Sequence, residues 1–154
     1  MAPDLLSGGK CQMEYRKYGN DYVVVMAKGE EILQAITEVC EKEKILLGTV
    51  TGIGAVGEVT LGVFNREKFE YESRTFTGDL EIASCSGNIS TMDGKTYLHI
   101  HMVAGNTAQG VCQGGHLNRG IISLTGEFFI HRIEGKVDRE YSPEIGLNLI
   151  KLID

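Results

Sequence analysis

Three of the four histidines lie close together in the sequence and could hold a metal ion. His99 and His101 are separated by one residue, so in a β-strand both side chains point to one face, about 7 Å apart along the backbone. His116 follows a predicted turn at residues 105–106, and a hairpin there would return it beside the first two. Three imidazoles without a fourth protein ligand form the donor set of an open zinc site, in which water completes the tetrahedron. Imidazole also suits nickel, copper and iron, and a polar surface cluster is the alternative, so the residues alone predict a divalent metal ion of open identity.

A second class of function follows from the same histidines. Water bound to a metal in an open site loses a proton near neutral pH, so the alternative to a binding protein is a metal-dependent hydrolase or lyase. Glu81 and Glu127 lie in otherwise apolar predicted strands, where a carboxylate faces solvent, orients a histidine or acts as a general base. Glu81 is the candidate catalytic residue. We expect a binding protein rather than an enzyme, and we expect His131 to be a hydrogen-bonded histidine of the sheet.

A glycine-rich segment, GIGAVG at residues 52–57, matches the dinucleotide fingerprint G-x-G-x-x-G. That fingerprint must open a helix, because the pyrophosphate rests on the N-terminus of the helix. Residues 58–64 alternate as a strand instead. The glycines are therefore predicted to form a bend or bulge between strands, and no nucleotide cofactor is predicted.

The elements that position the three histidines are predicted to be mostly strands. Apolar residues take a helical period only between Gly29 and Lys44, where they form one amphipathic stripe. Elsewhere β-prone segments are separated by glycine turns, with hairpin signals at residues 19–20 and 93–94. One break is predicted at Gly54, between strands over residues 45–53 and 55–64. The sequence predicts an α+β fold with a mainly antiparallel, twisted sheet of about seven strands and one main α-helix.

The length and the charge limit the organisation and the partners of the chain. The 154 residues suffice for one domain, which we expect over residues 13–154 after a flexible leader at residues 1–12. No apolar run is long enough for a membrane helix, so no membrane partner is expected. The 15 basic residues are dispersed and outnumbered by 21 acidic ones, giving a net charge of −6. This composition disfavours DNA binding, which needs a positive surface.

The cysteines indicate the compartment. Their spacing contains no C-x-x-C pair, so neither a zinc knuckle nor a thioredoxin motif is predicted for Cys11, Cys40, Cys85 and Cys112. The first residues have no signal-peptide pattern, and we therefore expect free thiols in the reducing cytoplasm. Cys40 and Cys85 are expected in the core.

Several ordered motifs together resemble the PPC domain, a domain of unknown function that plants and prokaryotes share. The resemblance extends over residues 13–153, and its motifs are GIGAV at 52–56, VTLG at 59–62, LEI at 80–82, SGNI at 86–89, HIH at 99–101 and GGHL at 114–117.

The resemblance implies a largely antiparallel sheet with one main helix, assembled as a homotrimer. Prokaryotic members carry the histidine pattern and are associated with a bound metal, usually zinc, which transfers to His99, His101 and His116. Plant members join the domain to AT-hooks, and the family is labelled DNA-binding for that reason. This chain has no Arg-Gly-Arg-Pro core, so the part that reads the minor groove is missing. The resemblance therefore implies a zinc-binding homotrimer with a regulatory role.

Overall fold

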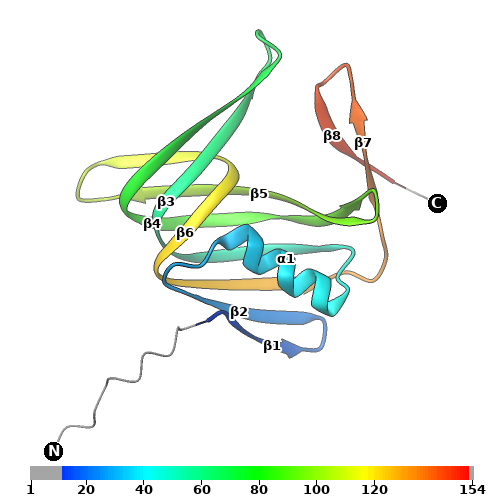
Figure 1. The fold of residues 1–154 in the computed structure, drawn as a ribbon, viewed down its shortest axis with the longest axis horizontal. Coiled ribbons are helices and arrows are strands. Elements are labelled where there is room, and N and C mark those ends of the chain that lie inside the picture. The colour runs from blue at the N-terminus through cyan, green and yellow to red at the C-terminus, as the bar shows by residue number, and fades with distance from the viewer. Residues whose placement is uncertain (1–11, 153–154) are drawn as a thin grey trace, which may run out of the picture.

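The computed structural model describes residues 12–152, in eight strands and one helix (Figure 1). The leader predicted over residues 1–12 lies outside this range except for Gln12, and Cys11 lies outside it too. In chain order the elements are β1 (Glu14–Tyr18), β2 (Asp21–Ala27), α1 (Ile32–Glu43), β3 (Gly48–Asn65), β4 (Glu70–Met92), β5 (Lys95–Asn106), β6 (Val111–Arg132), β7 (Asp138–Ser142) and β8 (Leu147–Lys151).

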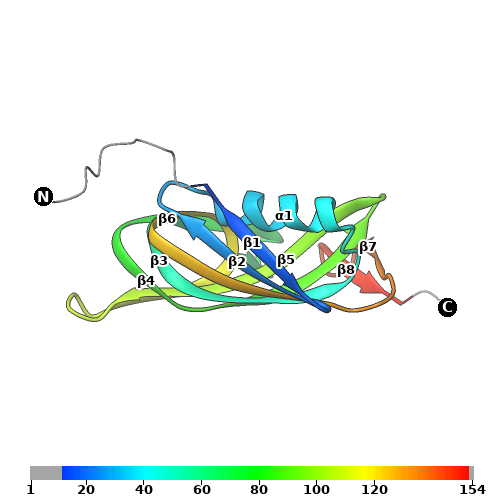
Figure 2. The same cartoon turned by 90° about the horizontal axis from the view of Figure 1, so that it is seen from below.

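Six strands form one antiparallel sheet in the order β1-β2-β6-β3-β4-β5, and β7 and β8 form a separate hairpin. β5 also pairs with the first part of β6. The four strands therefore form a closed ring of pairings, β3–β4, β4–β5, β5–β6 and β6–β3. Helix α1 lies along one face of the sheet, which we call the inner face (Figure 2). The predicted α+β class with a mainly antiparallel sheet and one helix is confirmed.

Helix α1 packs its apolar stripe against the inner face. Ile32, Ile36 and Val39 are fully buried and join a core cluster with Phe128 of β6 and Met102 of β5. At roughly 25 cal/mol per Å² of apolar surface, this burial is the main term that stabilises the helix on the sheet. Within the described part of the chain, no helix is both long and apolar enough to cross a membrane.

Two residues of the segment predicted to be helical cap the ends of the helix and are not part of it. Glu31 is the N-cap, and its carboxylate accepts a hydrogen bond from the Gln34 N–H at 2.8 Å. The same side chain accepts one from the Gly120 N–H at 3.0 Å, which ties the helix start to β6. Lys44 is the C-cap, in a left-handed conformation.

The predicted break at Gly54 is wrong, because β3 runs without interruption from Gly48 to Asn65. The register of β3 shifts at Gly54 against both β4 and β6, so the segment 52–57 forms a bulge within one strand, as its glycines predicted. Gly54 has φ +143°, and an added Cβ would overlap the carbonyl oxygen of Thr125. A side chain there would break the close approach of β3 to β6.

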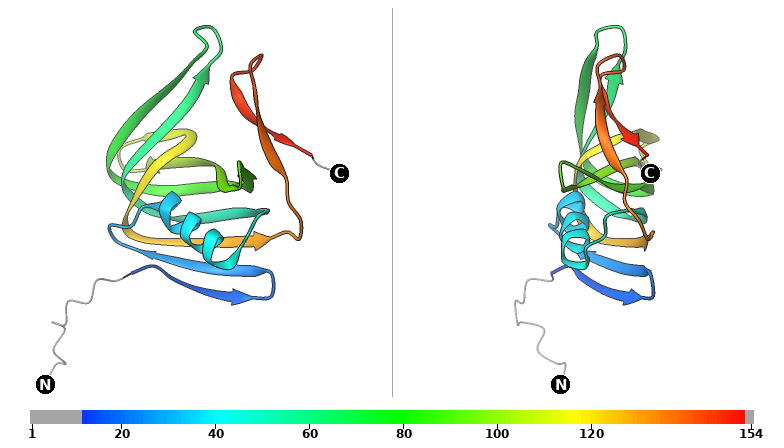
Figure 3. Two further views of the ribbon diagram at one scale, coloured as in Figure 1. Left: turned by 45° about the vertical axis from the view of Figure 1, so that its right-hand side comes forward. Right: turned by 90° about the vertical axis from the view of Figure 1, so that its right-hand side faces the viewer.

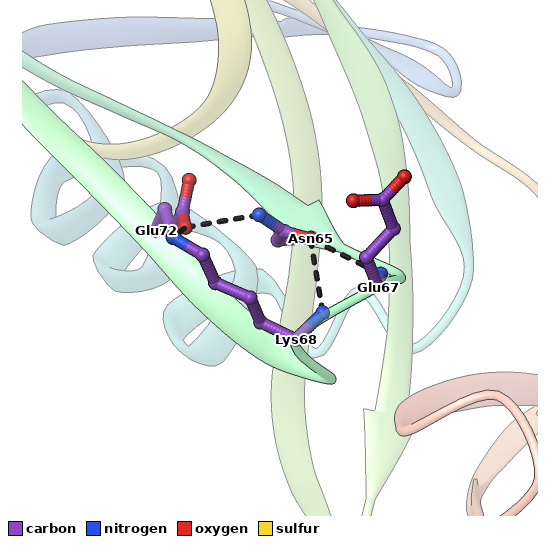
Figure 4. Close-up of polar contacts among 4 residues, drawn as sticks. All are labelled: Asn65, Glu67, Lys68 and Glu72. Carbon is purple, nitrogen blue, oxygen red and sulfur yellow. Dashed lines mark hydrogen bonds and ion pairs between the residues drawn. The ribbon is translucent and has the colours of Figure 1, made fainter.

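The turn between β3 and β4 is held by one asparagine (Figure 4). Asn65 Oδ1 accepts hydrogen bonds from the backbone N–H groups of Glu67 and Lys68, at 3.1 and 3.2 Å. Its Nδ2 donates to Glu72 at 3.0 Å, and Lys68 Nζ donates to the same carboxylate at 2.8 Å. This network shapes the projecting tip of the hairpin, residues 63–72.

The β7–β8 hairpin, whose first strand the sequence did not predict, stands apart from the main sheet (Figure 3). Thr91 of β4 anchors its start, donating from Oγ1 to Asp138 at 2.6 Å and from its N–H to the Val137 carbonyl at 3.2 Å. At the other end, a Cβ added to Gly146 would lie 2.7 Å from Cζ of Phe64. The turn of the β7–β8 hairpin therefore packs against the tip of the β3–β4 hairpin.

We expect Gly54→Ala to destabilise the fold by about 2–3 kcal/mol, because it adds both backbone strain and a clash with Thr125. Gly57→Ala is the matched control, since its Cβ would only touch Ser123 at 3.4 Å and its φ lies outside the positive range that side chains rarely adopt. The measurement is the free energy of unfolding in a denaturant titration. Equal effects of the two substitutions would contradict the role assigned to Gly54.

Candidate metal centre

The three histidines come from one hairpin. His99 and His101 lie on β5 and His116 lies on β6, directly opposite His101 in the register. The predicted hairpin that folds His116 back is confirmed, but residues 105–106 are the paired end of β5 and the turn itself lies at residues 107–110. On β5 the intervening Ile100 and the following Met102 are buried on the inner face. The alternation of the strand therefore places His99 and His101 on the opposite face, which we call the outer face.

The three side chains converge on one point. One ring nitrogen from each histidine lies within 4.8 Å of the other two. The Nε2 atoms of His99 and His101 are 3.2 Å apart, and the ring centroids of His101 and His116 are 4.2 Å apart. Two ligand nitrogens on a tetrahedral ion, with metal–nitrogen bonds of about 2.0–2.1 Å, are separated by about 3.3–3.4 Å. The geometry of the first two histidines already matches that of a shared ion.

The surroundings of His99 and His116 favour the neutral imidazole over the protonated form. Partial burial lowers the pKa of His99 below its usual value, and the neighbouring His116 and Arg139 lower it further. Partial burial also lowers the pKa of His116, with a contribution from His101. A metal ion binds the unprotonated nitrogen, so both shifts reduce the competition from protons. The donor set, all nitrogen, fits a borderline metal ion better than magnesium or calcium, which prefer oxygen.

The other predicted residues lie away from this cluster. Glu81 is exposed on β4 opposite Gly105, four positions along β5 from His101, so the structure does not bring it to the histidines. Glu127 is exposed on β6 opposite Val25. His131 is hydrogen-bonded to Asp21 at 2.7 Å, which confirms its place as a satisfied histidine of the sheet. Cysteines 40 and 85 are buried and free, as expected, and Cys112 is exposed and free.

A pocket of about 630 Å³ opens beside the cluster, and two of the histidines, His99 and His116, line it. Three parts of the fold form its walls: the β3–β4 hairpin, the β5–β6 hairpin and the β7–β8 hairpin. Tyr71 of β4 crosses to β6, where its hydroxyl donates to Asn118 Oδ1 at 2.9 Å, and its ring lies 6.0 Å from that of His116. Arg139 of β7 also lines the pocket.

Sequence reasoning missed these lining residues. Tyr71 is 45 positions before His116 and Arg139 is 23 positions after it, and neither stands in a recognisable motif. A basic residue in the short strand β7 resembles any exposed arginine until the packing of the β7–β8 hairpin is known. No local signal could have marked them as part of one pocket.

Solved structures of similar sequence share this fold. A Bacteroides thetaiotaomicron protein, provisionally described as DNA-binding, has 36% identity and a TM-score of 0.87, covering 91% of this chain and 97% of its own. A protein from Archaeoglobus fulgidus, described as metal-containing, has 30% identity and a TM-score of 0.82, with 91% and 98% covered. A plant- and prokaryote-conserved protein of Pyrococcus horikoshii has 29% identity and a TM-score of 0.77, with 95% and 99% covered.

A comparison with curated protein sequences gives no significant match. A model of the Plants and Prokaryotes Conserved (PCC) domain matches residues 13–134, from the start of the sheet to the end of β6. This range contains the bulge of β3 and all three histidines, the motifs on which the resemblance was based. The chain therefore belongs to the Plants and Prokaryotes Conserved domain family.

Proposed function

We propose that this protein binds one zinc ion per chain through His99, His101 and His116 and acts as a homotrimer with a regulatory rather than a catalytic role. The convergence of three imidazole nitrogens within 4.8 Å carries the proposal. Zinc is the preferred ion because three imidazoles with one open position are typical of tetrahedral zinc. The metal-containing relative from Archaeoglobus fulgidus, at 30% identity, supports a metal in this family.

A metal-dependent hydrolase or lyase is the second candidate, favoured by the pocket that opens on two of the histidines. When bound, zinc would lower the pKa of a water ligand towards about 7. Hydrolysis also needs a group that moves protons, and among residues 12–152 no carboxylate lines the pocket. Glu81, the predicted general base, is exposed elsewhere on β4. The pocket is therefore better suited to binding a ligand than to hydrolysing one.

The outer face supports the trimer. Four exposed apolar side chains lie on it between β2 and β5, around the exposed Glu127, and we call them the outer apolar patch: Val25, Ile53, Val103 and Phe129. Phe129 is 54% exposed and Ile53 57% exposed, and the described helix lies on the other face (Figure 2). Exposed apolar side chains that gather on one face are typical of interaction sites, and a second copy of the chain would cover them.

The cytoplasm is the proposed compartment. Cys40, Cys85 and Cys112 are all free thiols, a state that a reducing environment preserves. Burial raises the pKa values of Cys40 and Cys85 to about 12, so these two thiols remain protonated and unreactive.

We expect the protein, stripped with chelator and reloaded, to bind one zinc ion per chain, and His99→Ala/His101→Ala to weaken this binding more than about 100-fold, because one remaining imidazole cannot hold the ion. His131→Ala is the matched control, since His131 lies in the same sheet but pairs with Asp21. Titration calorimetry and elemental analysis measure the affinity and the stoichiometry. Equal zinc content in all three proteins would refute the site.

In light scattering we expect a mass three times the 16.9 kDa of one chain. Phe129→Asp buries a charge in the proposed interface and should shift the mass towards one chain. Leu46→Asp places the same charge on an exposed apolar residue in the connection between α1 and β3, and should leave the mass unchanged. A single-chain mass for the unmodified protein at micromolar concentration would exclude the trimer.

DNA binding should be weak, although two relatives are provisionally described as DNA-binding. We expect dissociation constants no tighter than about 10⁻⁴–10⁻⁶ M, rising with salt, because the net charge of each chain is −6 and each phosphate contact needs a cation. Titration of mixed duplexes at two salt concentrations tests this. Nanomolar, sequence-selective binding at physiological salt would contradict it.

A further inference from the structure

One buried cation in the pocket has no negative partner among residues 12–152. Arg139 is only 8% exposed, yet none of the ion pairs formed within residues 12–152 includes it. Its two acidic neighbours in sequence are engaged elsewhere: Asp138 pairs with Lys136 at 3.4 Å, and Glu140 with Lys151 at 2.8 Å. A buried arginine normally meets a carboxylate, because burying an unmatched charge is costly.

Neutral groups hold the guanidinium in place. Its Nε donates to Ser90 Oγ at 2.8 Å, Nη1 to the Asn148 carbonyl at 2.9 Å and Nη2 to Asn88 Oδ1 at 2.7 Å. The guanidinium carbon also lies 4.5 Å from the centroid of the Tyr97 ring. These bonds use three of the five N–H groups of an arginine and supply no negative charge. The side chain is therefore fixed in orientation, while its charge stays unmatched.

This charge lies beside the candidate metal centre. Asn88, which accepts from Nη2, is directly opposite His99 in the β4–β5 register, and Ser90 is opposite Tyr97. Both Arg139 and His99 line the same pocket. A ligand in the pocket would thus lie between a fixed guanidinium and the histidine cluster.

The remaining walls suit the organic part of such a ligand. Phe64, Leu98 and Leu147 line the pocket together with the rings of Tyr71 and Tyr97, and no carboxylate of the described chain does. A volume of about 630 Å³ is within the usual range of small-molecule sites, about 300–1,000 Å³. One cation without a competing carboxylate, in a largely apolar pocket, selects an anion that carries an apolar group.

We propose that this pocket binds a small organic anion, with its carboxylate on Arg139, its apolar part against Phe64 and Leu147, and a further oxygen directed at the three histidines. The contact with Arg139 is independent of any metal, whereas the last contact rests on the proposed zinc function. A phosphate monoester offers the same oxyanion chemistry and is the other source of a ligand.

The test compares three probes by titration calorimetry: mandelate, mandelamide and phenyl phosphate. Mandelate and mandelamide have the same phenyl and hydroxyl groups and differ in the charge that Arg139 would recognise. For the unmodified chain we expect mandelate to bind about 10–100-fold more tightly than mandelamide, as charge-assisted hydrogen bonds allow. Equal affinities would overturn the proposal. Tighter binding of phenyl phosphate than of mandelate would keep the anion site and assign it to phosphate monoesters.

Three variants locate the charge. Arg139→Met should abolish the preference for mandelate, and Arg139→Lys, which keeps the charge but loses the planar fork, should retain part of it. Lys151→Met is the matched control, because it removes an exposed cation from the same hairpin outside the pocket lining, and should bind as the unmodified chain does. If Arg139→Met does not fold, Arg139→Lys decides: full retention of mandelate affinity would overturn the role of the guanidinium.

The same titrations with chelator-treated and zinc-loaded protein separate this inference from the proposed function. A preference for mandelate in the metal-free chain, together with failure to bind zinc, would leave the anion site standing and remove the metal centre. Zinc binding without any preference for mandelate would leave the metal centre standing and remove the anion site. When both sites exist, zinc should tighten mandelate binding further, because the hydroxyl oxygen of mandelate is a possible ligand for the open position of the ion.

Discussion

The register between β5 and β6 is the constraint on which the site depends. His101 is paired with His116, and this pairing alone brings residues from two strands into ligand distance. Side chains alternate along both strands, so a slip by one residue would turn His116 towards the inner face and bury it under α1. The apolar residues that alternate with the histidines, Ile100 and Met102, prevent the slip because they must stay in the core. The packing of the inner face thus determines the chemistry of the outer one.

The same division explains the unequal character of the two faces. The inner face is closed by one helix, whose stripe of isoleucine and valine completes the core. The outer face carries the histidines, the outer apolar patch and the side chains of β4 that bind Arg139 of the β7–β8 hairpin. Because α1 covers the inner face, the outer face remains available for ligands and for other protein chains.

The helix and the histidine pair on β5 could be predicted from the sequence, because each depends on the spacing of residues close together in the chain. The helical period over residues 29–44 and the one-residue spacing of His99 and His101 each report a regular element directly. Gly54 was different: its glycine marked an irregularity, but a bulge within β3 and a break between two strands have the same local composition, and only pairing with β4 and β6 distinguishes them. Arg139 could not be found, because its partners Asn88 and Ser90 lie 51 and 49 positions away.

These sequence separations also imply an order of assembly. The three histidines occupy a stretch of 18 residues, so closing one short hairpin gathers them at a small cost in chain entropy. The wall that carries Arg139 requires contacts across 46 to 51 positions, so closing it costs more chain entropy. Contacts of short sequence separation form faster than those of long separation, so we expect the histidines to come together before Arg139 reaches its partners. During folding, the candidate metal donors would therefore be gathered first, and the arginine wall of the pocket would be added later.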